Sequence, residues 1–172
     1  MEAGSDPVAH TLALMDHPNI ARVLDAGAMV LMLPRVETRE QVEQFVSYMK
    51  YPPVGVRGAS AGRAHTDYGS PGPRELVEHM NEHTLVVLQI ERARAVENID
   101  ELLSVPGVDV ALIGPFDLTI SLGEASPQAP AVSAAIQRVV DAGKRHGVAT
   151  GIHSHDAGEV LARDGVAVGE DE

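Results

Sequence analysis

The chain contains no cysteine and no tryptophan, and only 3% of its residues are aromatic. The absence of cysteine excludes disulfides, thiol catalysis and zinc or iron–sulfur sites held by thiolates. The shortage of aromatic side chains removes the stacking platforms on which proteins bind exposed bases. A formal net charge of −12 removes the basic surface that nucleic-acid phosphates require. We therefore expect no nucleic-acid partner, and a core built from aliphatic residues and methionine.

Long apolar runs are also missing. No stretch approaches the ~20 apolar residues that a membrane-spanning helix needs, so we expect no membrane partner. The first residues, Met1-Glu2-Ala3-Gly4-Ser5-Asp6, lack the basic start and apolar stretch of a signal peptide. The cytoplasm is the default location. A length of 172 residues suits one domain, and no linker-like composition divides the chain, so residues 1–172 are predicted to form a single domain.

Apolar runs alternate with amphipathic segments along the chain. Strands are predicted at residues 28–33, 85–91, 108–115 and 148–152, with a weak one at 166–168, and helices at 37–50, 74–80, 92–104 and 131–146. This order is typical of α/β proteins with parallel strands and right-handed crossovers. Continuous apolar runs indicate strands covered on both faces. A (β/α) barrel and a doubly wound sheet both satisfy the pattern, although a complete barrel typically needs ~250 residues.

Two of the predicted strands end in a carboxylate, Glu91 and Asp117. The carboxyl ends of parallel strands are where α/β proteins build their sites. Two hard oxygen donors at that edge suit Mg²⁺ or Mn²⁺ better than zinc. Gly114, at the end of the second strand, would let a ligand approach the backbone closely. The alternative is a pair of structural carboxylates in salt bridges with Arg63, Arg92 or Arg94.

Other motifs carry weaker hypotheses. Gly58-Ala59-Ser60-Ala61-Gly62 has the spacing of a hydrolase nucleophile elbow, which requires a strand before Ser60 and a helix after it. A two-proline turn and a short extended piece (54–58) precede it instead, and a glycine-rich loop follows. His153 and His155 follow the fourth predicted strand and are either a metal or proton-transfer pair or solvated loop residues. The lysines lie near helix ends, which disfavours Schiff-base chemistry.

Several ordered segments resemble one family, the HpcH/HpaI aldolase/citrate lyase family of metal-dependent (class II) pyruvate aldolases. The resemblance extends from about residue 16 to residue 151. The segments that carry it are Leu24-Asp25-Ala26-Gly27-Ala28, Leu33-Pro34-Arg35-Val36-Glu37-Thr38, Tyr51-Pro52-Pro53-Val54-Gly55-Val56-Arg57-Gly58, Gln89-Ile90-Glu91, Ala95-Val96-Glu97-Asn98-Ile99-Asp100-Glu101 and Ile113-Gly114-Pro115-Phe116-Asp117-Leu118-Thr119.

The resemblance implies a (β/α)₈ TIM-type barrel in a homo-oligomer, usually a hexamer. It implies a divalent metal (Mg²⁺, Mn²⁺ or Co²⁺) held by Glu91 and Asp117. Gln89, Asp117 and the backbone around Gly114 and Phe116 would contact the 2-oxoacid substrate. The reaction would be the reversible cleavage of a 4-hydroxy-2-oxoacid to pyruvate and an aldehyde. Asp25 matches a catalytic acidic residue that raises the basicity of the family's general-base histidine across a subunit interface.

The sequence also departs from the family's pattern. The segment that carries the general-base histidine is not found, and His10 does not match it. No arginine precedes Arg22, where the family places one that stabilises the enolate. The first strands and the last helix of the barrel are not recognised either, so we expect an incomplete barrel with weak or no aldolase activity. The alternative function is a catalytically silent family member that serves as an oligomerising or binding module.

Overall fold

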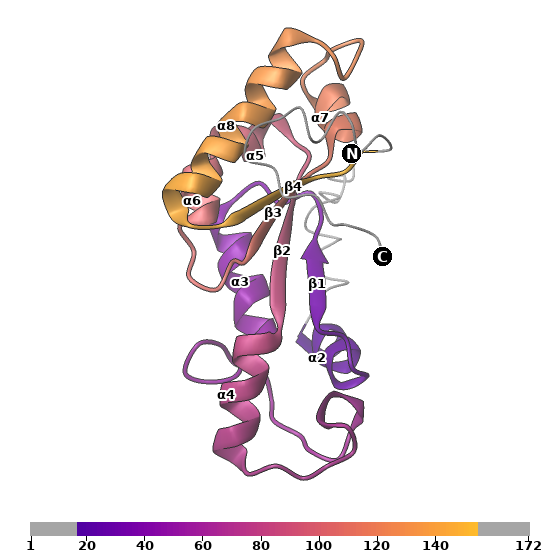
Figure 1. Cartoon of the computed structure of the whole chain (residues 1–172), viewed down its shortest axis with the longest axis vertical. Coiled ribbons are helices and arrows are strands. Elements are labelled where there is room, and N and C mark those ends of the chain that lie inside the picture. The colour runs from indigo at the N-terminus through magenta and orange to yellow at the C-terminus, as the bar shows by residue number, and fades with distance from the viewer. Residues whose placement is uncertain (1–16, 155–172) are drawn as a thin grey trace, which may run out of the picture. The chain divides into compact units, whose positions relative to one another are not determined.

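The structure, a computed structural model, describes residues 17–154 (Figure 1). Its four strands form one sheet in the order β1-β2-β3-β4, and the pairs β2–β3 and β3–β4 are parallel. None of the helices in this range is long and apolar enough to cross a bilayer. The elements in chain order are α2 (His17–Asp25), β1 (Val30–Leu33), α3 (Arg39–Met49), the 3₁₀ helix η1 (Ala64–Thr66), α4 (Pro73–His83), β2 (Leu85–Ile90), α5 (Ala93–Glu97), α6 (Ile99–Leu103), β3 (Val110–Ile113), α7 (Pro115–Ser121), α8 (Pro130–His146) and β4 (Ala149–Ile152).

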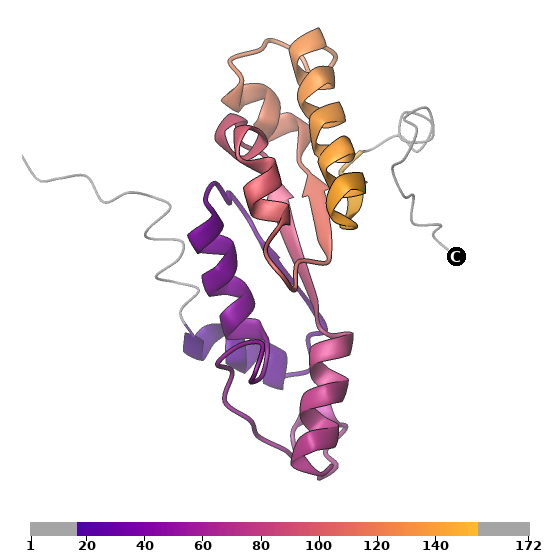
Figure 2. The ribbon, with the colours of Figure 1, turned by 90° about the vertical axis from the view of Figure 1, so that its left-hand side faces the viewer.

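The chain divides into two compact units. Of the described residues, 17–31 and 43–85 belong to the first unit, and 32–42 and 86–154 belong to the second unit. In the second unit, α5, α6 and α8 lie together on one side of the sheet (Figures 1 and 2). The core on this side is aliphatic, as the composition predicts. It is built from strand and helix residues that are fully or almost fully buried, among them Leu88, Ile90, Ala111, Ile113, Leu102, Val132, Ile136 and Val139.

Helix α8 approaches the sheet closely because it carries a glycine at the contact. A β-carbon on Gly143 would lie 2.4 Å from Cγ2 of Thr150 and 2.8 Å from the carbonyl oxygen of Val148. The helix then ends at Gly147, which has a φ of 68° in the left-handed region. A residue without a β-carbon adopts this conformation readily, and its N–H satisfies a carbonyl of the last turn. The sequence prediction of this helix and of its stop is confirmed.

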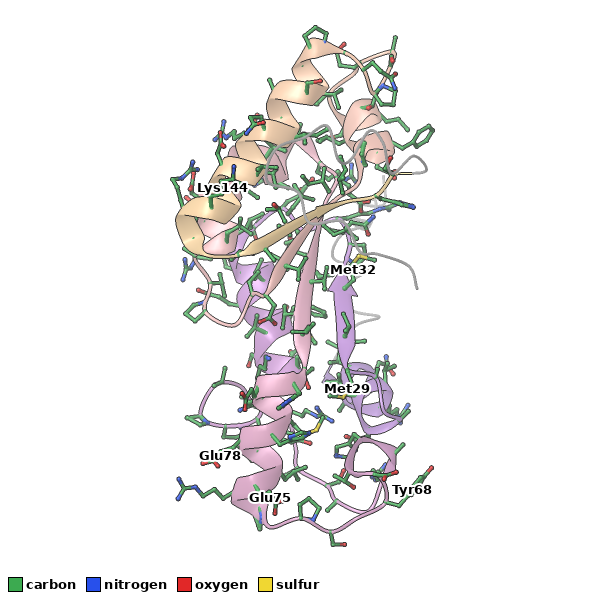
Figure 3. All side chains as sticks on the ribbon, viewed as in Figure 1. Met29, Met32, Tyr68, Glu75, Glu78 and Lys144 are labelled. Carbon is green, nitrogen blue, oxygen red and sulfur yellow. The ribbon has the colours of Figure 1, made fainter. Side chains whose placement is uncertain are left out.

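The opposite face of the second unit's sheet is not fully buried. Met32 of β1 is 41% exposed (labelled in Figure 3), and Gln89, Val110 and Leu112 are half-buried. Successive side chains of a strand point to opposite faces. Within residues 17–154, therefore, helices bury one face of these strands. From the continuous apolar runs, the sequence predicts that both faces are covered.

The first unit is held by the turn after α3 and its contact with α4. Tyr51, Leu76 and Met80 form a small buried cluster. The Asn81 side chain accepts a hydrogen bond from the Tyr51 backbone N–H at 2.7 Å and donates to the Tyr51 carbonyl at 3.1 Å. The buried Nζ of Lys50 donates to the carbonyl oxygens of Asn81 and Thr84. Lys50 therefore anchors the end of α4.

The predicted α/β class with parallel strands is confirmed, and several boundaries differ. The helix predicted at 92–104 is interrupted at Asn98, whose side-chain amide donates to the carbonyl of Glu37 at 2.9 Å. The third strand ends at Ile113, two residues before the predicted end, because Pro115 starts α7. Proline suits the first helical position, where no N–H is needed. No strand forms at residues 54–58, and the weak strand predicted at 166–168 lies outside the described residues.

Candidate functional site

Glu91 is the first residue after β2, and it is only 5% exposed. Its Oε1 accepts a hydrogen bond of 2.9 Å from the backbone N–H of Arg35. Arg35 follows β1 and Pro34, and its φ of 54° lies in the left-handed region that a β-carbon disfavours. A strained turn at the end of one strand therefore directs a backbone donor at the carboxylate that ends the next strand.

Burial raises the pKa of the Glu91 carboxyl above its ordinary value. The hydrogen bond from Arg35 opposes this change, and the negative charge of Asp117 raises the pKa further, against the positive charges of Arg35 and Arg92. Burial thus disfavours the ionised form of Glu91 more than its neighbours favour it. A cation placed beside Glu91 would supply that compensation.

Gly114 completes a small cradle with Glu91 and Gln89. The register pairs Ile90 with Ile113, and the backbone N–H of Gly114 donates to the carbonyl of Ile90 at 3.0 Å. A β-carbon on Gly114 would lie 3.2 Å from Cβ and 3.4 Å from Oε2 of Glu91, and 3.4 Å from Nε2 of Gln89. A single methyl group would thus crowd the space beside the carboxylate and the amide. The structure brings these three predicted site residues together.

Asp117 lies in the first turn of α7 and not at the end of a strand, which corrects the predicted boundary. Its side chain is exposed, and its charge reaches Glu91 strongly enough to raise the pKa of that carboxyl. Phe116 precedes it and is 70% exposed. The two acidic residues thus differ in setting, since one is buried and the other is open to solvent. The predicted substrate contact of the backbone near Phe116 stays a prediction.

The donor set fits a hard divalent cation better than a structural zinc ion. Within residues 17–154, no cluster of three or more histidine, aspartate and glutamate side chains is positioned to hold a metal. Mg²⁺ is commonly bound through one or two carboxylates, with waters and substrate oxygens completing its shell. Structural zinc needs four protein ligands. Two carboxylates are donors of the kind that Mg²⁺ takes, and the metal-ligand roles of Glu91 and Asp117 stay predictions.

The alternative of structural salt bridges finds little support among the described residues. Nε of Arg92 lies 3.9 Å from Oε1 of Glu37, and Nε of Arg63 lies 3.8 Å from Oδ2 of Asp25. These two arginines thus pair with other carboxylates. None of the ion pairs found in residues 17–154 includes Glu91.

Asp25 belongs to the first unit, whereas the five other predicted site residues belong to the second. Its Oδ1 accepts a hydrogen bond of 2.9 Å from Nη2 of Arg57, and its Oδ2 accepts one of 3.1 Å from the hydroxyl of Ser60. Arg57 is 1% exposed and stacks over the ring of Tyr51, with 4.6 Å from Cζ to the ring centroid. Asp25 is therefore fixed by a buried guanidinium, and its side chain keeps 15% exposure.

Ser60 does not have the setting of a hydrolase nucleophile. No strand precedes it in residues 51–59, and the first helix after it is the three-residue 3₁₀ helix η1. Its hydroxyl donates to Asp25, and Nε2 of His65 lies 3.0 Å from its carbonyl oxygen. His153 directly follows β4, and its backbone N–H donates to the carbonyl of Ile113 at 2.9 Å. The predicted histidine pair remains a prediction because His155 lies outside the described residues.

One contributor to the site was missed by sequence reasoning. The Arg35 backbone N–H contacts Glu91 directly, but the sequence analysis gave Arg35 no role. The signal was its position just after the strand 30–33, because the carboxyl ends of neighbouring parallel strands meet at one edge. A backbone donor leaves no trace in residue type, so only its position could have indicated it.

A buried carboxylate at the carboxyl edge of a parallel sheet, beside a glycine cradle, places the chain among α/β proteins with an acidic site at the strand ends. The family model of the HpcH/HpaI aldolase/citrate lyase matches residues 12–170, and the chain belongs to this family. The resemblance seen in the sequence is thereby confirmed.

The chain is similar to aldolases from several bacteria. It is 37% identical over 155 residues to the hydroxypyruvate/pyruvate aldolase of Deinococcus radiodurans, covering 87% of this chain and 53% of that protein. It is 35% identical to the 4-hydroxy-2-oxo-heptane-1,7-dioate aldolase of Klebsiella pneumoniae, covering 80% of this chain and 52% of that protein. The solved HpcH/HpaI aldolase from Desulfitobacterium hafniense DCB-2 matches with a TM-score of 0.80 and 35% identity, covering 86% of this chain and 57% of that one. The chain thus spans about half the length of the curated relatives it matches.

Proposed function

We propose that this chain carries the metal and oxoacid site of a class II pyruvate aldolase, a lyase that reversibly cleaves a 4-hydroxy-2-oxoacid to pyruvate and an aldehyde. The observation that carries the proposal is the buried Glu91 carboxylate, whose pKa is raised and which shares a cradle with Gln89 and Gly114. The names of the similar proteins support the reaction class.

Glu91 and Asp117 would hold the cation, which we take to be Mg²⁺, Mn²⁺ or Co²⁺. When bound, such a cation acts as a Lewis acid that polarises the 2-oxo group and stabilises negative charge on the enolate. The Gln89 amide can donate a hydrogen bond to a substrate oxygen that enters beside Gly114. The absence of a β-carbon there leaves room for the pyruvate part of the substrate. Glu91 must be ionised to act as a ligand, so cation binding displaces any proton it carries.

Asp25 is proposed to act on a general base supplied by a neighbouring subunit of a homo-oligomer. The support is its fixed orientation, since Arg57 and Ser60 hold its two carboxylate oxygens while part of the side chain remains accessible. A small 2-oxoacid is the proposed partner, and the cytoplasm is the proposed location.

The test measures cation binding and turnover separately. Mn²⁺ binding to the 172-residue chain is measured by calorimetry, and pyruvate release from a 4-hydroxy-2-oxoacid is followed with lactate dehydrogenase. We expect one Mn²⁺ equivalent that is lost in Glu91→Gln and kept in Glu101→Gln, and weak pyruvate release that depends on the cation. Unchanged Mn²⁺ binding in Glu91→Gln would overturn the site. Mn²⁺ binding with no pyruvate release would instead favour the silent binding module.

A further inference from the structure

The outer surface of α4 carries two histidines one helical turn apart, His79 and His83. Both are exposed, and their rings stack with centroids 4.2 Å apart and planes inclined by 25°. Residues four apart on a helix share one face. The same helix exposes Glu75 one turn before His79 (Figure 3), whereas Glu78 is paired with Nε of Arg74 at 2.7 Å. This cluster belongs to the first unit and takes no part in the proposed aldolase site.

The orientation of His83 is fixed by a backbone contact. Its Nδ1 lies 2.8 Å from the carbonyl oxygen of His79. A carbonyl oxygen only accepts hydrogen bonds, so Nδ1 carries the hydrogen and Nε2 keeps its lone pair. Metal-binding histidines are commonly held in this way, with one ring nitrogen donating to a backbone carbonyl and the other free to coordinate.

We propose that His79 and His83 form a surface site for a late first-row divalent transition metal, with Cu²⁺, Ni²⁺ and Zn²⁺ as the ions it takes. Imidazole nitrogen suits these ions, whereas Mg²⁺ prefers oxygen donors. The two rings already lie against each other, so chelation requires side-chain rotation only. No third protein ligand joins them among the described residues, and water completes the coordination shell. The bound ion therefore exchanges readily.

Binding at this pair also links two turns at the end of α4. His83 is the last residue of the helix, and the next residue, Thr84, donates its N–H to the carbonyl of Met80 at 3.0 Å. An ion that joins His79 to His83 is bound only while this last turn is helical. Folding and binding are therefore coupled, and the ion raises the unfolding temperature of the chain.

The test uses the full 172-residue chain without a purification tag and Ni²⁺ as the probe. The variants are His79→Gln, His83→Gln and the double variant. The matched control is His146→Gln, which removes an imidazole at the end of α8 that pairs with Asp100 at 2.9 Å. Calorimetry gives the affinity and stoichiometry, circular dichroism verifies the helix content of each variant, and a melting curve gives the thermal shift.

We expect one Ni²⁺ equivalent at this pair, in addition to any Ni²⁺ that Glu91 and Asp117 bind, and we expect Glu91→Gln to keep it. Its affinity should fall about tenfold or more in each single variant, because losing a ligand costs at least as much as losing a residue that orients a ligand. The His146→Gln control should keep both the affinity and the thermal shift, and excess Mg²⁺ should not displace this equivalent. The proposal is overturned if the wild type does not bind Ni²⁺, or if the double variant binds it as the wild type does.

Discussion

At the scale of the single residue, Gly114 sets the room beside Glu91. The Gly114→Ala variant places a methyl group 3.2 Å from the β-carbon of Glu91 and 3.4 Å from Nε2 of Gln89. Both side chains must then move, so we expect Mn²⁺ affinity to fall about tenfold or more and stability to fall by about 1–3 kcal/mol. Calorimetry and urea unfolding measure the two effects. The control is Gly58→Ala, where a β-carbon meets nothing within 4 Å. Equal Mn²⁺ affinity in the two variants would contradict the cradle.

The ionised form of Glu91, which cation binding needs, is expected to lower the stability of the folded chain in the absence of a cation. Its pKa in the folded chain is raised above the ordinary value of 4.5, mainly by burial. Above pH 4.5, the folded chain therefore holds the proton more tightly than the unfolded chain does. The contribution of Glu91 to stability is thus present at low pH and is lost as the pH rises through its folded pKa.

The Glu91→Gln variant should consequently be more stable than the wild type at neutral pH and in the absence of metal. We expect a gain of up to about 1 kcal/mol, because solvent near the sheet edge screens the charge. The glutamine oxygen can still accept the Arg35 hydrogen bond. Urea unfolding of both proteins from pH 4 to pH 8 measures the difference, which should grow with pH. A difference that stays constant or shrinks would show that Glu91 is compensated within the fold.

At the scale of the elements, Gly143 sets the distance between α8 and β4. The Gly143→Ala variant would place a methyl group 2.8 Å from the Val148 carbonyl oxygen, and backbone cannot yield as a flexible side chain does. We expect a loss of about 1–3 kcal/mol in the free energy of unfolding, even though alanine favours helix more than glycine does. Ala134→Gly, at an exposed position of the same helix, is the matched control and should cost about 1 kcal/mol. Stabilisation by Gly143→Ala would contradict the packing.

The ion pair between Asp25 and Arg57 joins α2 to the segment after α3. Arg57 is fully buried, and its Nε and Nη1 have no hydrogen-bond partner among the described residues. The Asp25→Ala variant would leave this cation without its carboxylate, at a cost of about 3–5 kcal/mol in unfolding experiments. The control is Asp100→Ala, which breaks a half-exposed pair with Arg145 and should cost about 1 kcal/mol or less. Recovery of stability in Asp25→Ala/Arg57→Met would confirm the unpaired charge as the cause, whereas equal losses in the two alanine variants would refute it.

Sequence patterns predicted the elements that are regular and missed those that depend on contacts. Helix α8 and strand β2 follow from apolar periodicity and from an uninterrupted apolar run, which are local properties. The break at Asn98 depends on a hydrogen bond to Glu37, which is 61 positions away. The apolar run predicts a strand as far as Pro115, whereas this proline starts helix α7, because proline suits the first position of a helix equally well.

The candidate site shows the same division. Glu91, Gln89 and Gly114 were predicted from strand ends and from the family resemblance, and the parallel register brings them together. The predicted role of Asp25 comes from the family resemblance alone. The contact of Asp25 with Arg57 depends on tertiary packing. The position of Arg35 after a strand could have indicated it, but the direction of its backbone N–H could not be predicted, because that direction depends on a left-handed turn at a residue that is not glycine.

At the scale of the whole molecule, the two units share their secondary structure. Their boundaries fall between residues 31 and 32, 42 and 43, and 85 and 86. The boundary at 31/32 lies inside β1, the boundary at 42/43 lies inside α3, and the boundary at 85/86 lies inside β2. Boundaries between independent domains normally fall in exposed linkers. The division into two units therefore follows contacts and not the limits of secondary-structure elements, and the single domain stays a prediction.

A single domain should unfold in one cooperative transition, and the distribution of tyrosines makes this testable. The chain has three tyrosines, Tyr48, Tyr51 and Tyr68, and no tryptophan, so its intrinsic fluorescence reports only on the first unit. Circular dichroism reports strongly on the 17-residue helix α8 of the second unit. We expect the two urea unfolding curves to coincide. Gly143→Ala, a change in the second unit, should shift the tyrosine curve as far as the dichroism curve. Two separate midpoints, or a tyrosine curve that ignores this substitution, would show that the units unfold independently.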